Sequence, residues 1–342
     1  MRAAPLLIVA VLALFAAPAQ AQSGIDSYRY TACAATGGTS LVEVVAAPCA
    51  EAQAVATQVA TFPVAGEASA LTALGWTPLR ARSTSGGGAH DVVAVRGRAV
   101  LRIRRSGAAP DLDGWQAGRE LIFARNRLVG GRPVPKGAAL CTSAFLVRVR
   151  SGSLGGLSAA HCGGLRSDRT VHRRNVGLRR SPQPGIILGR VQRIVTRSKP
   201  LDALVVPVPS GAGRTAVPVV DRGVSRPPWS VAGVADPTAG RAVCFTGRTS
   251  GVDRCGSIAG SRARRAERLI SAFSGVIVRC TTIRARSGDS GGPVYTAPGA
   301  DGRVRAVGIV TLVVGESARM CFTPLKPVLE TLGARLAVAS AE

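Results

Sequence analysis

Three short segments of the chain carry side chains that together could cleave an amide bond. Ser290 lies in the glycine-rich string SGDSGGP, residues 287–293. His161 lies among small residues in SAAHC, residues 158–162, and Asp202 stands at the start of an apolar run. A serine hydroxyl becomes a nucleophile when a histidine takes its proton and a carboxylate orients that histidine. The segments therefore predict a nucleophile, a general base and an orienting acid.

Gly288 is expected to complete this chemistry by helping to form an oxyanion hole. A glycine there lets the backbone turn so that the N–H groups of Gly288 and Ser290 can point at one spot. Each such donor typically contributes about 100- to 1000-fold in rate. Asp168, Asp221 and Asp236 lie in turn-like polar contexts and are the alternatives to Asp202.

The elements that position these residues are predicted to be mainly β-strands after residue 22, because apolar residues alternate with a period of two. Gly and Pro clusters interrupt the strands at short intervals, which is typical of an all-β sandwich or barrel. Helices are expected at about 49–58 and 326–336. The predicted strands are 40–45, 91–95, 100–104, 191–195, 204–208, 276–280 and 304–310.

The segment 106–118 interrupts this pattern with Gly, Pro and Asp and separates a small α/β unit at residues 28–104 from the rest. Residues 96–98 predict a hairpin turn within that unit. His90, beside Asp91 on a glycine-rich loop, is not expected to take part in catalysis.

The first residues and the cysteines point to export. Arg2, a short apolar run at 6–15 and small residues up to Ala21 predict a signal peptide at residues 1–21, with a retained membrane anchor as the alternative. No later stretch is apolar enough to span a bilayer, so a secreted, extracellular protein is expected. Eight cysteines fit an oxidising compartment. The absence of a C-x-x-C pair and the presence of three histidines argue against a metal site, and no cofactor is implied.

The formal net charge of +25 is carried almost entirely by arginine. Such a charge attracts polyanions, including cell-wall polymers and nucleic acid, through its long-range field. Aromatic residues make up 4% of the chain and are not interleaved with basic ones, which argues against a stacking platform for nucleic acid. A solvated basic surface is the simpler interpretation.

The order His, Asp, Ser, together with SAAHC and SGDSGGP, resembles the chymotrypsin-like serine peptidases. The likeness extends to their bacterial branch, which contains the streptogrisins and α-lytic protease. The string CFTGRTSG, residues 244–251, leading to Cys255, resembles a short disulfide loop of that branch. LVGG, residues 128–131, resembles the start of the mature enzyme there.

The resemblance covers residues 128–336 and implies two six-stranded antiparallel β-barrels, at about 128–222 and 228–336, followed by a C-terminal helix. It implies a peptidase domain at 128–342 that hydrolyses protein or peptide substrates through an acyl-enzyme. Residues 22–127 are then a pro-region or a retained accessory domain, and Arg127 before LVGG slightly favours the pro-region of a zymogen. The resemblance implies the disulfides Cys141–Cys162 and Cys244–Cys255, which leaves Cys280 to pair with Cys321 and Cys33 to pair with Cys49.

One departure concerns Asp289, which in this branch pairs with an arginine that follows the first cysteine of the short loop. Here that position is Phe245. The amino group of Leu128, freed by cleavage after Arg127, is therefore the candidate partner for Asp289.

Substrate selection is predicted from the strand that follows the nucleophile. By resemblance, Thr311, Leu312 and Val313 bind substrate, and Val313 would narrow the pocket so that small aliphatic residues are preferred. Arg284, six residues before Ser290, is the competing feature, because a cation there would favour acidic residues. The alternative function is a catalytically idle, protease-like protein that binds polyanions.

Overall fold

The computed structural model describes residues 28–84, 88–107, 113–129, 132–163, 170–174, 184–190, 193–194, 201–208, 214–260, 263–314 and 318–339. Within these residues the chain is mostly β, with few helices, as its alternating pattern predicts. None of the described helices is both long and apolar enough to cross a membrane. The predicted signal peptide, residues 1–21, and the alternative acid Asp168 lie outside the described residues.

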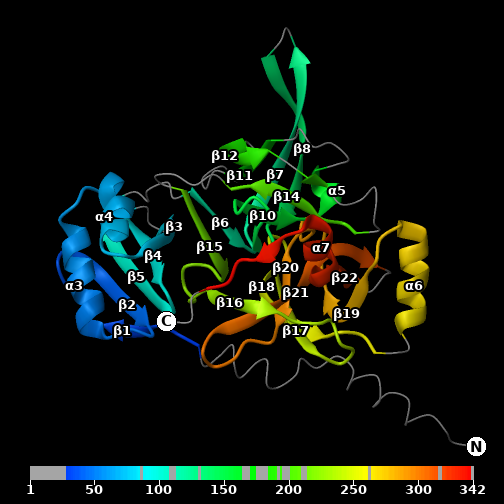
Figure 1. Cartoon of the computed structure of the whole chain (residues 1–342). Coiled ribbons are helices and arrows are strands. Elements are labelled where there is room, and N and C mark those ends of the chain that lie inside the picture. The colour runs from blue at the N-terminus through cyan, green and yellow to red at the C-terminus, as the bar shows by residue number, and fades with distance from the viewer. Residues whose placement is uncertain are drawn as a thin grey trace, which may run out of the picture.

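Residues 28–107 form a separate α/β layer, coloured blue to cyan in Figure 1. Its five strands pair antiparallel in the order β1-β2-β5-β4-β3, and two helices cover one face. Buried residues of the sheet, such as Val42 and Leu101, pack against Val55 and Leu71 of the helices. The elements are β1 (Thr31–Cys33), β2 (Thr39–Val45), α3 (Cys49–Ala60), the 3-10 turn η1 (Val64–Gly66), α4 (Glu67–Ala73), β3 (Thr77–Ser83), β4 (Ala89–Arg96) and β5 (Ala99–Ser106).

The hairpin predicted at residues 96–98 joins β4 to β5. Arg96 pairs with Ala99 at its base, and Gly97 adopts a φ of 54°. A positive φ costs glycine little, which explains why this tight turn forms here.

The rest of the described chain is built from three further sheets (Figure 1). One has the strand order β13-β14-β10-β9-β23, one has the order β12-β11-β7-β8, and the third is a nine-stranded sheet that contains the nucleophile segment. The elements from β6 to β14 are β6 (Asp113–Ala117), β7 (Glu120–Val129), β8 (Arg132–Thr142), β9 (Leu146–Arg148), β10 (Leu154–Ser158), α5 (Ala160–Gly163), β11 (Thr170–Arg174), β12 (Pro184–Arg190), β13 (Arg193–Ile194) and β14 (Leu204–Pro207). Those from β15 onward are β15 (Arg214–Val220), β16 (Trp229–Val234), β17 (Ala242–Gly247), β18 (Gly251–Ser257), α6 (Ala263–Ser274), β19 (Arg279–Arg284), β20 (Pro293–Thr296), β21 (Arg303–Val314), β22 (Arg319–Pro324), α7 (Leu325–Leu332) and β23 (Arg335–Leu336).

The described sheets differ from two antiparallel six-stranded barrels. The nine-stranded sheet is mixed, because β6 runs parallel to β15 and β16 runs parallel to β21. The described strands form no closed barrel. The two-barrel arrangement therefore stays a prediction of the resemblance.

The predicted boundary between residues 127 and 128 falls inside strand β7, which pairs with β8 over its whole length. Strand β6, in the segment expected to be a linker, pairs with β15. Both strands thus belong to the sheets of the second part of the chain, although they precede the predicted cleavage site. Removal of residues 22–127 stays a prediction, and it would take β6 and most of β7 away from their partner strands.

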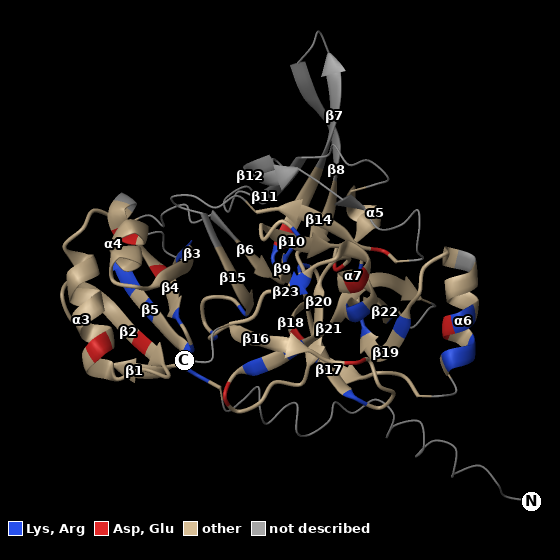
Figure 2. Ribbon diagram, in the orientation of Figure 1, with Lys and Arg blue, Asp and Glu red and all other residues tan. Residues whose placement is uncertain are grey.

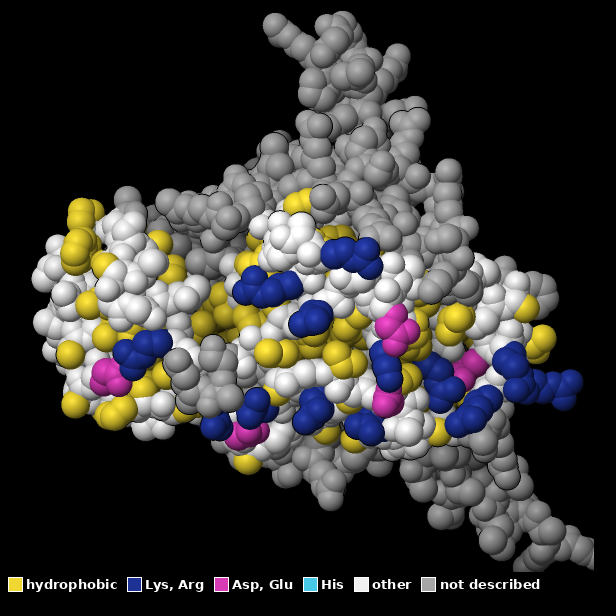
Figure 3. Space-filling model, in the orientation of Figure 1, with side chains coloured by type: hydrophobic (Ala, Val, Ile, Leu, Met, Phe, Trp, Pro, Cys, Tyr) yellow, Lys and Arg dark blue, Asp and Glu magenta, His cyan; other side chains and the backbone are white. Residues whose placement is uncertain are grey.

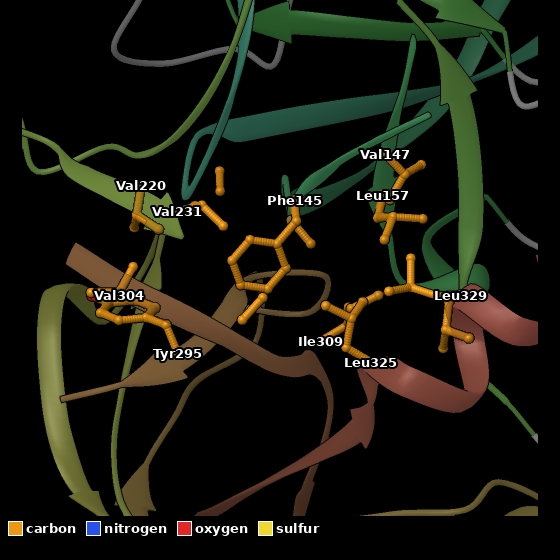
Figure 4. Packing of buried hydrophobic residues seen from close by; sticks show 14 of the residues in the cluster. Phe145, Val147, Leu157, Val220, Val231, Tyr295, Val304, Ile309, Leu325 and Leu329 are labelled. Carbon is orange, nitrogen blue, oxygen red and sulfur yellow. The ribbon is translucent and has the colours of Figure 1, made fainter. Parts of the chain in front are cut away.

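The main core lies where the sheets of the second part face one another (Figure 4). Phe145 and Leu157 pack there with Tyr295, Ile309 and the helix residue Leu325. All five side chains are 1% exposed or less. This packing joins the sheet that carries β10 and β14 to the sheet that carries β20 and β21.

The N-terminal layer packs directly on this second part. Tyr28 is 6% exposed and belongs to the main core cluster, where its ring stacks on Trp229 with the centroids 5.0 Å apart. Leu79 and Val93 of the layer form another buried cluster with Val219 of β15. The two parts are therefore held together by apolar contacts as well as by the chain.

Helix α7 ends earlier than the sequence pattern predicts. It stops at Leu332 because Gly333 adopts the left-handed conformation, with a φ of 59°. Residues 335–336 then form β23, which pairs with β9. The predicted helix over 326–336 is thus a helix followed by a short strand.

Candidate active site

Strand pairing brings His161 and Asp202 together. His161 lies in the short helix α5, directly after β10, and Asp202 lies directly before β14. Strands β10 and β14 are antiparallel neighbours, with Ser158 opposite Leu204. The end of one strand therefore lies beside the start of the other, so residues far apart in the sequence meet at one edge of the sheet.

The carboxylate of Asp202 holds both the ring and the backbone of His161. Its Oδ2 lies 2.7 Å from His161 Nδ1, and its Oδ1 accepts a 2.9 Å hydrogen bond from the backbone N–H of His161. Asp202 is 3% exposed, whereas the side chain of His161 is 48% exposed. The imidazole is thus oriented by a buried acid while it remains accessible from solvent.

This contact changes the proton affinity of the imidazole. Burial of the ring disfavours its charged form, but the hydrogen bond and the negative charge of Asp202 outweigh that effect. The pKa of His161 is therefore raised above the ordinary value of 6.5. A base with a raised pKa binds a proton more strongly at neutral pH.

The segment with Ser290 is tied to the same edge by Thr142, the last residue of β8. The Thr142 N–H donates to Ser290 O at 2.8 Å, and the Thr142 hydroxyl donates to Gly288 O at 2.9 Å. Cys162 Sγ lies 3.8 Å from Ser290 O and 3.9 Å from His161 Nε2. Among the described residues no hydrogen bond joins Ser290 Oγ to His161 Nε2, and such bonds are often long before substrate binds. The hydrogen bonds from Thr142 to the segment with Ser290 were not predicted from the sequence, although Thr142 directly follows Cys141.

The backbone around Ser290 leaves two donors unpaired. The N–H groups of Asp289, Gly291 and Gly292 each donate to a carbonyl, whereas in the described part of the chain those of Gly288 and Ser290 donate to none. Gly288 has a φ of 97°, a conformation that favours glycine. Because unpaired backbone donors are rare in folded proteins, these two N–H groups are suited to receive an anionic oxygen.

Asp289 is fixed by four hydrogen bonds. Its Oδ1 accepts from the N–H groups of Thr249 and Ser250, at 2.9 and 3.0 Å. Its Oδ2 accepts from the Ser250 hydroxyl at 2.5 Å and from the N–H of Arg286 at 2.8 Å. Thr249 and Ser250 were not assigned this function from the sequence, although they lie in the short loop that suggested the resemblance.

The expected pairing of Asp289 with the amino group of Leu128 requires cleavage after Arg127 and stays a prediction, because in this uncleaved chain Leu128 lies inside β7. Asp289 is fully buried, and its two oxygens already accept four donors, which fills their usual capacity. In the uncleaved chain Asp289 is therefore satisfied without an arginine at position 245.

Replacing Asp289 by alanine is expected to destabilise the protein and to lower activity. Three backbone N–H groups would lose their acceptor, and each unsatisfied buried group costs about 1–3 kcal/mol. Urea unfolding followed by fluorescence, together with turnover of a peptide, tests this expectation. Asp289→Asn, which keeps one acceptor oxygen, should fall between wild type and Asp289→Ala. Equal stability of Asp289→Ala and wild type would contradict the assignment.

The structure contains all four expected disulfides. Cys141–Cys162 joins the end of β8 to α5, beside the contact with Ser290. The described residues include no free cysteine. The other three bonds are Cys33–Cys49, Cys244–Cys255 and Cys280–Cys321.

One group of side chains in the described residues has the composition of a metal site, namely Cys141, His161 and Cys162. The two sulfurs are joined to each other, so neither is a thiolate that could bind a metal. The group is therefore explained by the disulfide beside the imidazole.

The predicted substrate residues lie on β21 but differ in exposure. Thr311 is 3% exposed, and its hydroxyl lies 2.8 Å from that of Thr323. Leu312 packs beside the Cys280–Cys321 disulfide, and Val313 is 42% exposed. Side-chain selection by these three residues stays a prediction.

The other acids and histidine examined from the sequence lie elsewhere. Asp221 accepts from the N–H of Gly223, and Asp236 is exposed. His90 is fully buried in the N-terminal layer, where its Nε2 lies 2.8 Å from Glu67 Oε2. His90 lies in strand β4 and not in the glycine-rich loop expected from the sequence, and its exclusion from catalysis stays a prediction.

Lys and Arg residues are distributed over many elements of the described chain (Figure 2). On the face in Figure 3 they are separated by apolar and uncharged side chains. Association with polyanions or cell-wall polymers finds no support in the comparisons with known proteins.

No family model and no curated protein matches the chain. Solved structures of bacterial chymotrypsin-like serine proteases do match, at modest TM-scores. Thermobifida fusca protease A is 23% identical over 66% of this chain and 99% of its own, with a TM-score of 0.46. Nocardiopsis protease is 20% identical over 66% of this chain and 100% of its own, also with a TM-score of 0.46. Cellulomonas bogoriensis chymotrypsin is 23% identical over 66% of this chain and 99% of its own, with a TM-score of 0.43.

Proposed function

We propose that the chain is a secreted serine endopeptidase in which His161, Asp202 and Ser290 form the catalytic triad. The observation that carries the proposal is the 2.7 Å contact between His161 Nδ1 and Asp202 Oδ2. This contact leaves His161 Nε2 as the basic nitrogen. Nε2 lies 3.9 Å from Cys162 Sγ, which in turn lies 3.8 Å from the carbonyl oxygen of Ser290. The unpaired N–H groups of Gly288 and Ser290, in the loop that carries the proposed nucleophile, support the proposal independently.

In the proposed reaction, His161 Nε2 takes the proton of Ser290 Oγ as this oxygen attacks the carbonyl carbon of the peptide. The carbonyl oxygen becomes negative and is stabilised by the N–H groups of Gly288 and Ser290. The imidazolium then gives its proton to the departing amine, the C–N bond breaks, and the acyl group stays on Ser290. A water molecule deprotonated by His161 attacks this ester, and the proton returns to Ser290 Oγ as the acid leaves.

Asp202 acts on His161 rather than on the substrate. By accepting from Nδ1–H it selects the tautomer with a basic Nε2, and its charge stabilises the imidazolium that forms during both steps. The raised pKa of His161 is consistent with this function. No cofactor is needed, because the side chains supply the nucleophile, the base and the acid.

Export is part of the proposal. The four disulfides support it, because such bonds persist in oxidising compartments and are rare in reducing ones. The proposed substrates are therefore proteins or peptides outside the cell.

Incubation of the purified protein with a denatured protein tests the proposal. New amino termini, detected by mass spectrometry, are expected with wild type and not with Ser290→Ala. An idle protease-like binding protein would leave the substrate intact in both samples, and this result would overturn the proposal.

A further inference from the structure

A pocket of about 390 Å³ lies beside the nucleophile loop and is lined by three arginines. Arg254 comes from β18, Arg284 is the last residue of β19, and Arg286 follows two residues later. Thr249 and Ser250 line the same pocket. All three arginines are exposed, so the pocket is open to molecules in solution.

The walls of this pocket also fix the segment that carries Ser290. The N–H groups of Thr249 and Ser250 hold the carboxylate of Asp289, the residue before the nucleophile. The carbonyl of Arg286 accepts from the N–H of Asp289 at 3.1 Å, which closes the turn between them. A group bound in the pocket would therefore lie beside the segment that carries Ser290, against a backbone with several hydrogen bonds.

The charges in the pocket are not balanced by acids. Within the described part of the chain, Arg254, Arg284 and Arg286 take part in no ion pair, and no carboxylate lines the pocket. Other arginines of the same part differ, because Arg222 Nε lies 2.8 Å from Asp253 Oδ2 and Arg279 Nη1 lies 3.3 Å from Glu267 Oε2.

The other side chains of the pocket offer no competing donors. The hydroxyl of Thr249 donates to Ser287 O at 2.8 Å, and that of Ser250 donates to Asp289 Oδ2. The guanidinium groups are thus the donors that remain for a ligand. Like charges gathered in a concave site repel one another and raise the local potential, so an anion there is favoured.

We infer that Arg254, Arg284 and Arg286 form a subsite for the carboxylate of an acidic substrate side chain next to the scissile bond. The inference rests on the proposed peptidase function and names its substrate class. Guanidinium groups match a carboxylate because they can donate two parallel hydrogen bonds to its two oxygens. Val313, which suggested selection of small aliphatic residues, is not among the residues that line this pocket.

The first test is a peptide library in which each position flanking the scissile bond is varied in turn. At one of these positions, kcat/KM is expected to be at least about tenfold higher for Glu than for the isosteric Gln, the size of one charge-assisted hydrogen bond. Added salt should reduce this ratio because it screens exposed charges. Equal values for Glu and Gln at every position would overturn the inference.

The second test uses Arg254→Gln, Arg284→Gln and Arg286→Gln, with Arg335→Gln as the matched control on an exposed strand outside the pocket. Each pocket variant is expected to lower the ratio of kcat/KM for Glu over Gln by about tenfold, whereas the control keeps it. A ratio that stays unchanged in all three pocket variants would overturn the subsite.

Fluorophosphonate labelling of Ser290 distinguishes failure of the subsite from failure of the proposed peptidase function. Wild-type labelling with no Glu preference would overturn the subsite and leave the peptidase function standing. Loss of both labelling and cleavage in the wild-type protein would overturn the proposed function itself, and the subsite with it.

Discussion

Replacing Ser290 or His161 by alanine is expected to lower kcat by about 10⁴-fold or more, because the triad acts as a unit. Without the hydroxyl there is no acyl-enzyme, and without the imidazole no group takes the proton from Ser290. The double variant should lose no more than either single variant, since each change already disables the same step. Hydrolysis of a fluorogenic peptide, followed under single-turnover and steady-state conditions, measures these losses.

Ser153→Ala is the matched control for this experiment, because Ser153 lies in the exposed turn between β9 and β10. It should retain wild-type turnover. Additive losses in the double variant, or residual turnover of Ser290→Ala close to wild type, would show that hydrolysis follows a different route.

Asp202→Asn is expected to lower kcat by about 10⁴-fold through the wrong imidazole tautomer. The asparagine amide can donate to Nδ1, which would leave Nε2 protonated and unable to accept a proton from Ser290. The overall shape of the site should be preserved, because the amide is nearly isosteric with the carboxylate.

The pH dependence of Asp202→Asn tests the function of Asp202 separately. His161 must be neutral to act as a base, so wild-type kcat/KM should fall as the pH drops through a His161 pKa that lies above 6.5. Without the negative charge of Asp202 this pKa falls, and the acid limb of the residual activity moves to lower pH. Asp236→Asn, at an exposed acid, is the control and should keep the wild-type profile. Near-normal activity of Asp202→Asn would mean that another carboxylate orients His161.

The residues of the candidate site were predictable because they lie in short strings with a specific composition. Ser290 and His161 are surrounded by small residues that allow a close backbone approach, and Asp202 directly precedes an apolar strand. The contact between His161 and Asp202 depends on the pairing of β10 with β14, and β10 was not among the strands predicted from the sequence. Two disulfide pairs, Cys141–Cys162 and Cys244–Cys255, followed from the resemblance, and the other two followed from the cysteines that remained.

The contacts of Asp289 could not be derived in the same way. They arise from backbone N–H groups of Thr249 and Ser250, and a backbone donor leaves no signature in residue type. The missing arginine at Phe245 therefore suggested a missing partner, whereas the loop itself supplies the donors. Pairing of Asp289 with the amino group of Leu128 after cleavage stays a prediction.

Several elements depend on tertiary pairing that a local pattern does not reveal. Strand β6 lies in a segment rich in Gly, Pro and Asp, yet its backbone pairs parallel with β15. Helix α6 was not predicted, although Ala, Arg, Glu and Leu in its sequence ARRAERLISAFS favour helix. One of its acids, Glu267, is 4% exposed and accepts from the N–H of Cys280, so the helix is held partly by a buried polar contact.

Reaction with a fluorophosphonate tests the central claim most directly, because only a serine activated by a neighbouring base reacts at an appreciable rate. The account predicts stoichiometric labelling of the folded protein, with the adduct mapped to Ser290 by peptide mass spectrometry. It also predicts that His161→Ala abolishes the reaction although Ser290 is still present. Labelling at another serine, or equal labelling of wild type and His161→Ala, would contradict the claim that His161, Asp202 and Ser290 form a working catalytic triad.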